Sequence, residues 1–187
     1  DLGIFRRNNT VTFNALSEGT YADCTLTVTD AVGYASTLSV SSFTVDTSAP
    51  TVSTISPADA ATAVSAGTTI AITFSEAMNT TTLTSNMSNT SCSGTLQVSS
   101  DNFSACVPMA SAPSASNSNK TFTIAPSDNL STATTYKVRV ITGVKDAAVG
   151  YTLGSQFETA SGFTTKAWTR SGDPLQRTKG REWQCGL

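Results

Sequence analysis

Three aspartates stand at turn positions where their carboxylates could bind a metal ion. Asp30 lies before a glycine-containing turn, Asp46 before a proline-containing linker, and Asp146 after a predicted strand. Calcium in proteins takes about six to eight oxygen ligands, mostly from carboxylates and backbone carbonyls. The alternative is that each aspartate only accepts hydrogen bonds from nearby backbone amides, which is why this residue is common in turns.

The four cysteines are Cys24, Cys92, Cys106 and Cys185. Cys92 and Cys106 would close a loop of about 15 residues, and such a disulfide stabilises by about 3 kcal/mol in the chain-entropy model. We predict this bridge; the alternative is two free thiols, because spacing alone does not show oxidation. A zinc site is not expected, since the chain has no histidine and no C-x-x-C pair.

The same lack of histidine bears on catalysis. Arrangements of the Ser-His-Asp and Cys-His kinds are impossible. Glu76 and Glu158 remain as candidates for a glycosidase-like carboxylate pair. No group of residues marks a nucleophile and its base, so we predict that the chain is not an enzyme.

These residues must be held by strands, because alternating polar and apolar residues recur along the chain. Over residues 20–30, Cys24, Leu26 and Val28 share one face and threonines occupy the other, which predicts a half-buried strand. A second such run covers residues 38–45, and residues 10–16 supply another short strand. An antiparallel sandwich needs about seven strands, so we expect residues 1–47 to be a truncated unit.

After residue 48 a full set of short strands is predicted. Turns rich in Ser, Asn, Gly and Pro separate them, which favours an antiparallel β-sandwich over alternating strands and helices. One helical turn is expected within residues 75–83, and a flexible loop over residues 111–119. The predicted strands cover residues 51–55, 68–74, 95–98, 120–124, 134–142 and 157–165.

Composition and charge exclude two classes of partner. Charged residues make up 13% of the chain, against about 25% in an average soluble domain. The net charge is −2, so no basic field would gather nucleic acid. No run of 18 apolar residues occurs, so no membrane span is expected. The tail, 167–187, carries Arg170, Arg177, Lys179 and Arg181 without strand patterning, and we expect it to be unstructured.

Several sequence motifs from residue 48 onward are typical of one protein family. They are S-A-P-T-V-S-T-I-S-P-A-D-A-A, I-A-I-T-F-S-E-A-M-N, L-S-T-A-T-T-Y-K-V-R-V, G-V-K-D-A-A-V-G-Y and G-F-T-T. With them, residues 48–165 resemble a bacterial Ig-like domain of the kind repeated in surface-layer proteins and large adhesins. The resemblance implies an all-β fold, an antiparallel Ig-like β-sandwich. One complete module would cover residues 48–166, preceded by the C-terminal strands of a related module over residues 1–47.

The resemblance also bears on the carboxylates. In an Ig-like topology the loop before the last strand lies at the end where the linker enters, so Asp146 should approach Asp46. Related repeat proteins bind calcium between modules, and we predict a tentative calcium site at Asp46 and Asp146. Asp30 would be the equivalent residue of the first module. Glu76 belongs to the S-E-A-M-N motif, which non-catalytic relatives share.

One tyrosine has the spacing of a structural corner. Tyr136 opens a predicted strand six residues after Leu130. This resembles the tyrosine corner, in which the hydroxyl bonds back to the backbone of the preceding turn. We therefore predict a structural role for Tyr136.

The predicted function is a non-catalytic spacer or stalk module of a secreted or cell-surface bacterial protein. Its partners would be neighbouring Ig-like modules of the same chain, with no cofactor unless calcium binds. Two alternatives remain: an adhesion or glycan-binding module that uses the region 92–119, or an accessory domain of a secreted hydrolase. Both tryptophans, Trp168 and Trp183, lie in the tail, which argues against glycan stacking.

Overall fold

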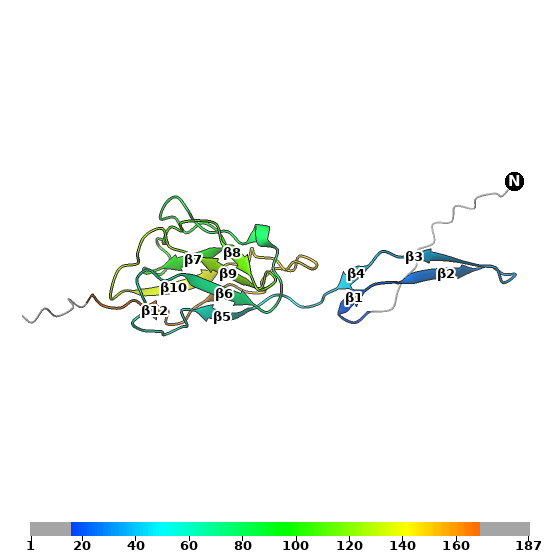
Figure 1. Ribbon diagram of the computed structural model, residues 1–187, viewed down its shortest axis with the longest axis horizontal. Coiled ribbons are helices and arrows are strands. Elements are labelled where there is room, and N and C mark those ends of the chain that lie inside the picture. The colour runs from blue at the N-terminus through cyan, green and yellow to red at the C-terminus, as the bar shows by residue number, and fades with distance from the viewer. Residues whose placement is uncertain (1–15, 169–187) are drawn as a thin grey trace, which may run out of the picture.

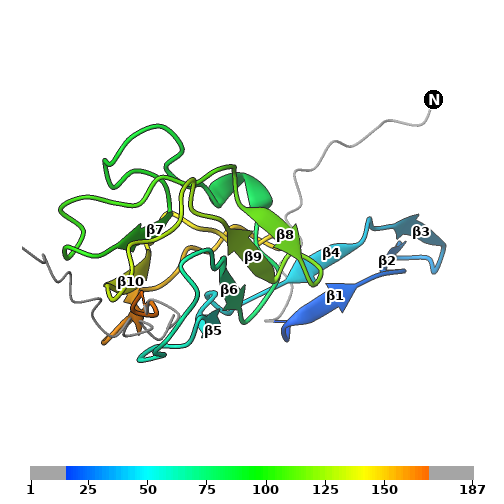
Figure 2. The same cartoon turned by 60° about the vertical axis from the view of Figure 1, so that its left-hand side comes forward.

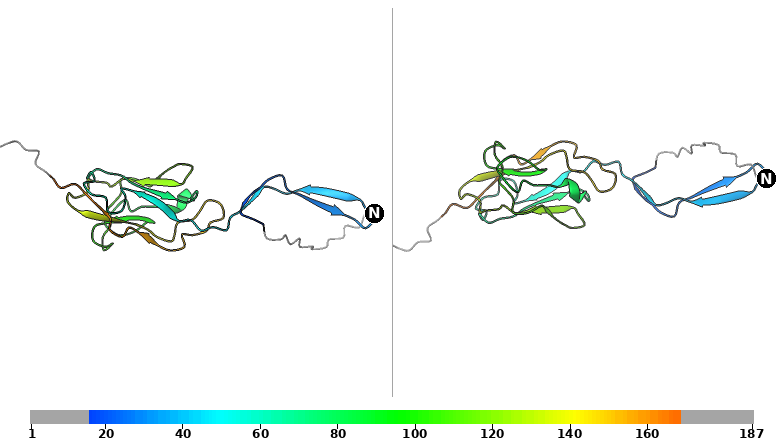
Figure 3. Two further views of the ribbon diagram at one scale, coloured as in Figure 1. Left: turned by 90° about the horizontal axis from the view of Figure 1, so that it is seen from below. Right: turned by 90° about the horizontal axis from the view of Figure 1, so that it is seen from above.

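The structure is a computed structural model that describes residues 16–168. Figure 1 shows a narrow ribbon of residues 16–47 joined end to end with a two-layered body that begins near Pro50. Views from below and above show the same arrangement (Figure 3). Residues 46–50, called the linker below, connect the two parts. The predictions for residues 10–15 and for the tail beyond Trp168 lie outside the described residues.

The body consists of two antiparallel sheets, as predicted. One sheet has the order β5 (Val52–Ser56), β6 (Ile70–Phe74), β9 (Thr121–Ile124) and β8 (Ser114–Ser116). In the other, β10 (Thr135–Val140) pairs with β7 (Leu96–Ser99), β11 (Phe157–Glu158) and β12 (Phe163–Thr164). Figure 2 shows β7 and β10 on one side, and β6, β8 and β9 on the other. The fold is therefore an all-β sandwich.

Alternating side chains of both sheets fill the core. Ile70, Ile72 and Phe74 of β6 are buried, while the residues between them are half-buried. The rings of Phe74 and Phe122 meet edge to face with their centroids 6.0 Å apart, a favoured aromatic geometry. The opposite sheet contributes Leu96, Val98, Tyr136, Val138 and Val140 to the same core. Burying each large apolar side chain contributes about 1.5–3 kcal/mol to the stability of the fold. Because apolar residues alternate along the strands, each sheet has one apolar face, and packing the two apolar faces together is favoured.

Tyr136 has the predicted structural role. Its side chain is buried, and its hydroxyl oxygen accepts a hydrogen bond of 3.0 Å from the backbone N–H of Ser131, five residues earlier. The ring also stacks on Phe163 of β12. The tyrosine thus fastens the turn before β10 to the core.

Three predicted elements differ from the structure. The strand predicted over residues 157–165 is split into β11 and β12 because Gly162 has a φ of +76°, which few residues other than glycine adopt. The carboxylate of Asp59 accepts hydrogen bonds from Ser161 and Gly162 at this bend. The predicted loop over residues 111–119 contains β8, whose three residues pair with β9. The helical turn is reduced to the 3-10 turn η1 (Thr80–Thr82).

Cys92 and Cys106 form the predicted disulfide, with a Cα–Cα distance of 4.9 Å. The bond ties the loop before β7 to the segment that follows it. Cys106 is buried, and its backbone N–H bonds to the carbonyl of Thr90. Cys24 is a free thiol in the ribbon, and Cys185 lies outside the described residues.

The ribbon holds four strands where two long runs were predicted over residues 20–45. β2 (Thr25–Thr29) pairs with β3 (Ala35–Ser39), and β1 (Gly19–Tyr21) pairs with β4 (Phe43–Val45). The first run is interrupted at Asp23, which has a φ of +57°. Among residues 16–168 neither pair is covered by a second sheet, and Val28 and Leu38 are 62% and 65% exposed there. A two-stranded hairpin is marginal by itself, so this part of the chain contributes little independent stability.

Candidate metal centre

Three carboxylates from separate parts of the chain converge where the linker meets the body. Asp46, Glu76 and Asp146 each offer an oxygen atom, and these atoms lie within 4.8 Å of one another. Asp146 is buried, and the other two are half-buried. We call these three residues the carboxylate cluster.

Strand pairing explains why Glu76 reaches the linker. β5 and β6 are antiparallel, with Val52 opposite Phe74, so the residues after β6 lie beside those before β5. Two backbone-linked hydrogen bonds extend this contact: Ser75 N–H donates to the Thr51 carbonyl, and Thr51 N–H donates to Ser75 Oγ. Glu76 follows directly and therefore faces the linker.

The loop that carries Asp146 is held against the turn after β6. The N–H of Ala147 donates to the carbonyl of Ala77, and the N–H of Asn79 donates to the carbonyl of Lys145, both at 2.9 Å. These bonds lie on either side of Asp146. The backbone therefore fixes Glu76 and Asp146 in the same small region before any ligand is considered.

Asp146 uses only one of its two carboxylate oxygens within the protein. Oδ1 accepts hydrogen bonds from the N–H groups of Ala148, Val149 and Gly150, at 2.7, 2.7 and 3.0 Å. Burial acts to raise the pKa of Asp146, but these backbone donors outweigh it and lower the pKa below its usual value. Asp146 is therefore a carboxylate anion at neutral pH. Its Oδ2 is buried and has no hydrogen-bond partner in the structure.

Asp46 belongs to the linker and is arranged by a local turn. Its Oδ1 accepts a hydrogen bond of 2.9 Å from the N–H of Ser48. Glu18 reaches the same turn from the ribbon, where its Oε2 accepts hydrogen bonds from the hydroxyls of Thr47 and Ser48. Through this turn the linker presents a carboxylate to the body.

Glu76 is affected by its acidic neighbours. Partial burial raises its pKa above the usual value, and the charges of Asp46 and Asp146, a hydrogen bond with Asp46 and the charge of Glu18 raise it further. Within residues 16–168 the ion pairs join only Glu158 to Lys137 and Arg139. No lysine or arginine in that range therefore neutralises the carboxylate cluster.

The structure brings together two of the three predicted metal ligands. Asp46 and Asp146 approach each other as the topology argument predicted, and Glu76 joins them. Asp30 is not in this group: its Oδ1 accepts hydrogen bonds from the N–H groups of Val32 and Tyr34 and closes the turn between β2 and β3. The turn alternative therefore describes Asp30.

Sequence reasoning missed Glu76 as a member of the cluster, although a signal was present. Strands were predicted at residues 51–55 and 68–74 of an antiparallel sandwich, without a statement that they pair. Had they been assumed to pair, the end of the second would lie beside the start of the first, which places an acid two residues beyond Phe74 near the linker. The S-E-A-M-N motif that contains Glu76 was interpreted only as part of the family resemblance.

Glu158, the other carboxylate considered with Glu76 for catalysis, is paired with two cations. Glu158 Oε2 accepts hydrogen bonds of 3.1 and 2.9 Å from Arg139, and its Oε1 lies 3.4 Å from the Lys137 ammonium. Burial acts to raise the pKa of Glu158, but these two cations lower it below its usual value. A carboxylate held ionised in this way is a poor general acid.

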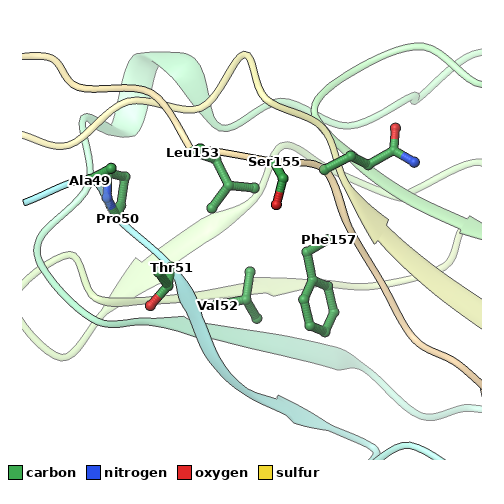
Figure 4. Close-up of a pocket in the computed structure, with 9 residues that line it drawn as sticks. Ala49, Pro50, Thr51, Val52, Leu153, Ser155 and Phe157 are labelled. Atoms are coloured by element: carbon green, nitrogen blue, oxygen red, sulfur yellow. The ribbon is translucent and has the colours of Figure 1, made fainter.

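A second feature is an open apolar hollow of about 320 Å³ beside the linker. It lies between β5 and the segment that leads into β11, and Figure 4 shows Val52 and Phe157 on its two sides with Leu153 above. Residues 49–52 and 153–157 line it, and none of them is charged. Its polar lining groups are the side chains of Thr51, Ser155 and Gln156, so the hollow holds no acid or base for catalysis.

Comparison with known proteins agrees with this architecture. The family model described as bacterial Ig-like domain matches residues 46–165. The chain belongs to this family. No curated protein matches the chain. Among residues 16–168, no helix has the length and apolar character needed to cross a membrane.

Solved structures similar to this Ig-like chain include parts of one surface-layer protein. The N-terminal part of the bacterial S-layer protein SbsC is 20% identical, with a TM-score of 0.44, over 63% of this chain and 24% of that one. Domains 1–6 of surface layer protein SbsC are also 20% identical, with a TM-score of 0.44, over 65% of this chain and 14% of that one. The chain thus spans a quarter or less of those structures.

Proposed function

We propose that this chain is a structural spacer module of a secreted or cell-surface bacterial protein and that it performs no catalysis. The observation that carries the proposal is the path of the chain through the Ig-like body. The chain enters at the end that faces the ribbon, and β12 and the segment to Trp168 lie at the opposite end (Figure 1). A module with this path extends a chain along one axis.

The disulfide supports an extracellular location. Disulfides persist in oxidising compartments and are rare in the reducing cytosol. The Cys92–Cys106 bond closes a loop that contains β7, which pairs with β10, so it restrains both segments that flank this strand. The family assignment is consistent with this location.

The binding alternative has less support. Glycan recognition by stacking needs exposed aromatic rings, and the region 92–119 offers only Phe103, whose ring is covered by the Arg139 guanidinium at 3.5 Å. The exposed aromatic side chains of the described residues are divided between the ribbon, the loop after Asp146 and the far end of the body: Tyr34, Phe43, Tyr151 and Trp168. They come from separate segments of the chain and form no continuous stretch of sequence.

Pulling on single molecules by the two ends of the full chain tests the spacer role. We expect the Ig-like body to unfold in one cooperative step. The released length should grow by about 50 Å after reduction, since the disulfide encloses a sequence separation of 14 residues and each extended residue spans about 3.6 Å. Gradual extension without a cooperative step would contradict a load-carrying module. Specific retention of the chain on a glycan array would favour the binding alternative.

A further inference from the structure

We propose that Asp46, Glu76 and Asp146 bind one calcium ion, and that this ion fastens the linker to the Ig-like body. Two of the ligands belong to the body and the third belongs to the linker, so a shared cation would join the two parts. The inference rests on the carboxylate cluster and is independent of the spacer role.

The unpartnered oxygen of Asp146 is the strongest argument for a ligand. Asp146 is only 1% exposed, and among residues 16–168 its Oδ2 has no hydrogen-bond partner, although Oδ1 accepts three hydrogen bonds. A buried charged oxygen without a partner is costly and is rare in native proteins. Since the other two carboxylates lie within 4.8 Å and accept rather than donate when ionised, a cation is the partner that satisfies all three.

The ligand chemistry fits calcium better than magnesium. Calcium binds oxygen at about 2.3–2.6 Å, so two ligands on opposite sides of the ion can lie about 5 Å apart. The three carboxylate oxygens lie within 4.8 Å of one another, which is compatible with that span. Magnesium requires near-ideal octahedral geometry and gives up its water reluctantly, so a protein site made of carboxylates on separate segments favours calcium.

The protein supplies part of a calcium shell, and water can complete it. Asp46 and Asp146 each use Oδ1 for backbone hydrogen bonds and so offer one oxygen. No backbone N–H among residues 16–168 restrains the Glu76 carboxylate, whose side-chain partner is Asp46, so it can bind through both oxygens. Four protein oxygens would then leave two to four positions of a six- to eight-ligand shell. Because Asp46 and Glu76 are half-buried, water can reach those positions.

Within the described residues, no lysine or arginine forms an ion pair with the cluster, since the ion pairs there join only Glu158 to Lys137 and Arg139. The Lys120 ammonium donates instead to the carbonyl of Ser75, directly before Glu76. Glu18 adds a further negative charge that raises the pKa of Glu76. The acids therefore attract a divalent ion, and their mutual repulsion is relieved when it binds.

Calorimetric titration of the oxidised full chain with calcium chloride at pH 7 tests the proposal. We expect one ion per chain with a Kd of about 10⁻⁴–10⁻³ M, the range of extracellular calcium modules, and weaker binding of magnesium chloride. Asp46→Asn and Glu76→Gln should each weaken calcium binding at least about tenfold, since each removes a charged ligand. Asp30→Asn removes one negative charge from an aspartate with similar turn bonds and should change the affinity less than about twofold, by charge screening.

A second measurement separates the site from general charge effects and from misfolding. Thermal unfolding without calcium should show that each variant remains folded. Hydrogen exchange should then show that calcium slows exchange at linker amides such as Ser48 in the parent chain and in Asp30→Asn, but not in Asp46→Asn. Absence of calcium binding at 10 mM, equal binding by Asp46→Asn and Asp30→Asn, or tighter binding of magnesium would overturn the proposal.

Discussion

Replacing Glu76 with glutamine should stabilise the metal-free protein and weaken its response to calcium. Glutamine keeps the size and removes the charge that Asp46 and Asp146 repel at up to 4.8 Å. In water-like surroundings each such pair costs about 1 kcal/mol, and we use that dielectric because Glu76 is half-buried. We therefore expect a gain of about 1–2 kcal/mol at pH 7 in EDTA.

In calcium, the parent chain should become more stable than Glu76→Gln. At a calcium concentration of about 100 times Kd, a ligand that binds only the folded state adds about 2.7 kcal/mol. The parent chain should gain that amount, whereas Glu76→Gln should gain much less because its site has lost a ligand. The assay is urea unfolding of both proteins in EDTA and in calcium, with Asp30→Asn as the control. Loss of stability in EDTA on replacing Glu76 would refute the electrostatic reasoning.

The pH dependence gives an independent check on the same pair of proteins. The folded-state pKa of Glu76 is raised above its ordinary value of 4.5, so the folded state holds the proton more tightly than the unfolded chain. The resulting stability is fully present below about pH 4.5 and is lost as pH rises through the folded-state pKa. The advantage of Glu76→Gln in EDTA should therefore be small at pH 4 and complete at pH 7. An equal advantage at both pH values would contradict this origin.

Three further predictions concern the Ig-like body, and each is measured by urea unfolding. Reducing the Cys92–Cys106 bond should cost about 3 kcal/mol for a loop of this size, and a protein with both cysteines replaced by serine should no longer respond to the reductant. Tyr136→Phe should cost about 0.5–1.5 kcal/mol because the half-buried hydrogen bond from the N–H of Ser131 is lost; an unchanged midpoint would show that this bond does not stabilise the fold. Gly162→Ala should cost more than about 1 kcal/mol, because φ is +76° and a Cβ would collide with the backbone of Tyr136, and a neutral result would show that the bend relaxes freely.

The residues that alternate most regularly were predicted well from the sequence. β6, β9 and β10 fall within the predicted ranges because one face of each is buried, as the burial of Ile72, Phe122 and Val138 shows. A slip of one residue would turn each of these side chains toward water. Where one side of a sheet is covered, the sequence pattern therefore determines both where a strand lies in the sequence and which of its faces is buried.

Short-range patterns could not predict features that depend on contacts between distant segments. β8 consists of Ser114, Ala115 and Ser116, all exposed, and it exists because β9 offers an open edge. The bend at Gly162 is held by Asp59, more than a hundred residues earlier. Neither relation leaves a periodic signal in the local sequence.

The carboxylate cluster, too, was only partly predictable from the sequence. The sequence by itself determined that Asp46 and Asp146 stand at turns, and a general topology brought those turns to one end of the body. Only the tertiary structure decided that Glu76 completes the group, that Asp30 stays in its own hairpin turn, and that Oδ2 of Asp146 is buried without a partner. The physical reason is that burial and pairing are properties of packed segments, whereas residue type and spacing determine only which groups are available to pack.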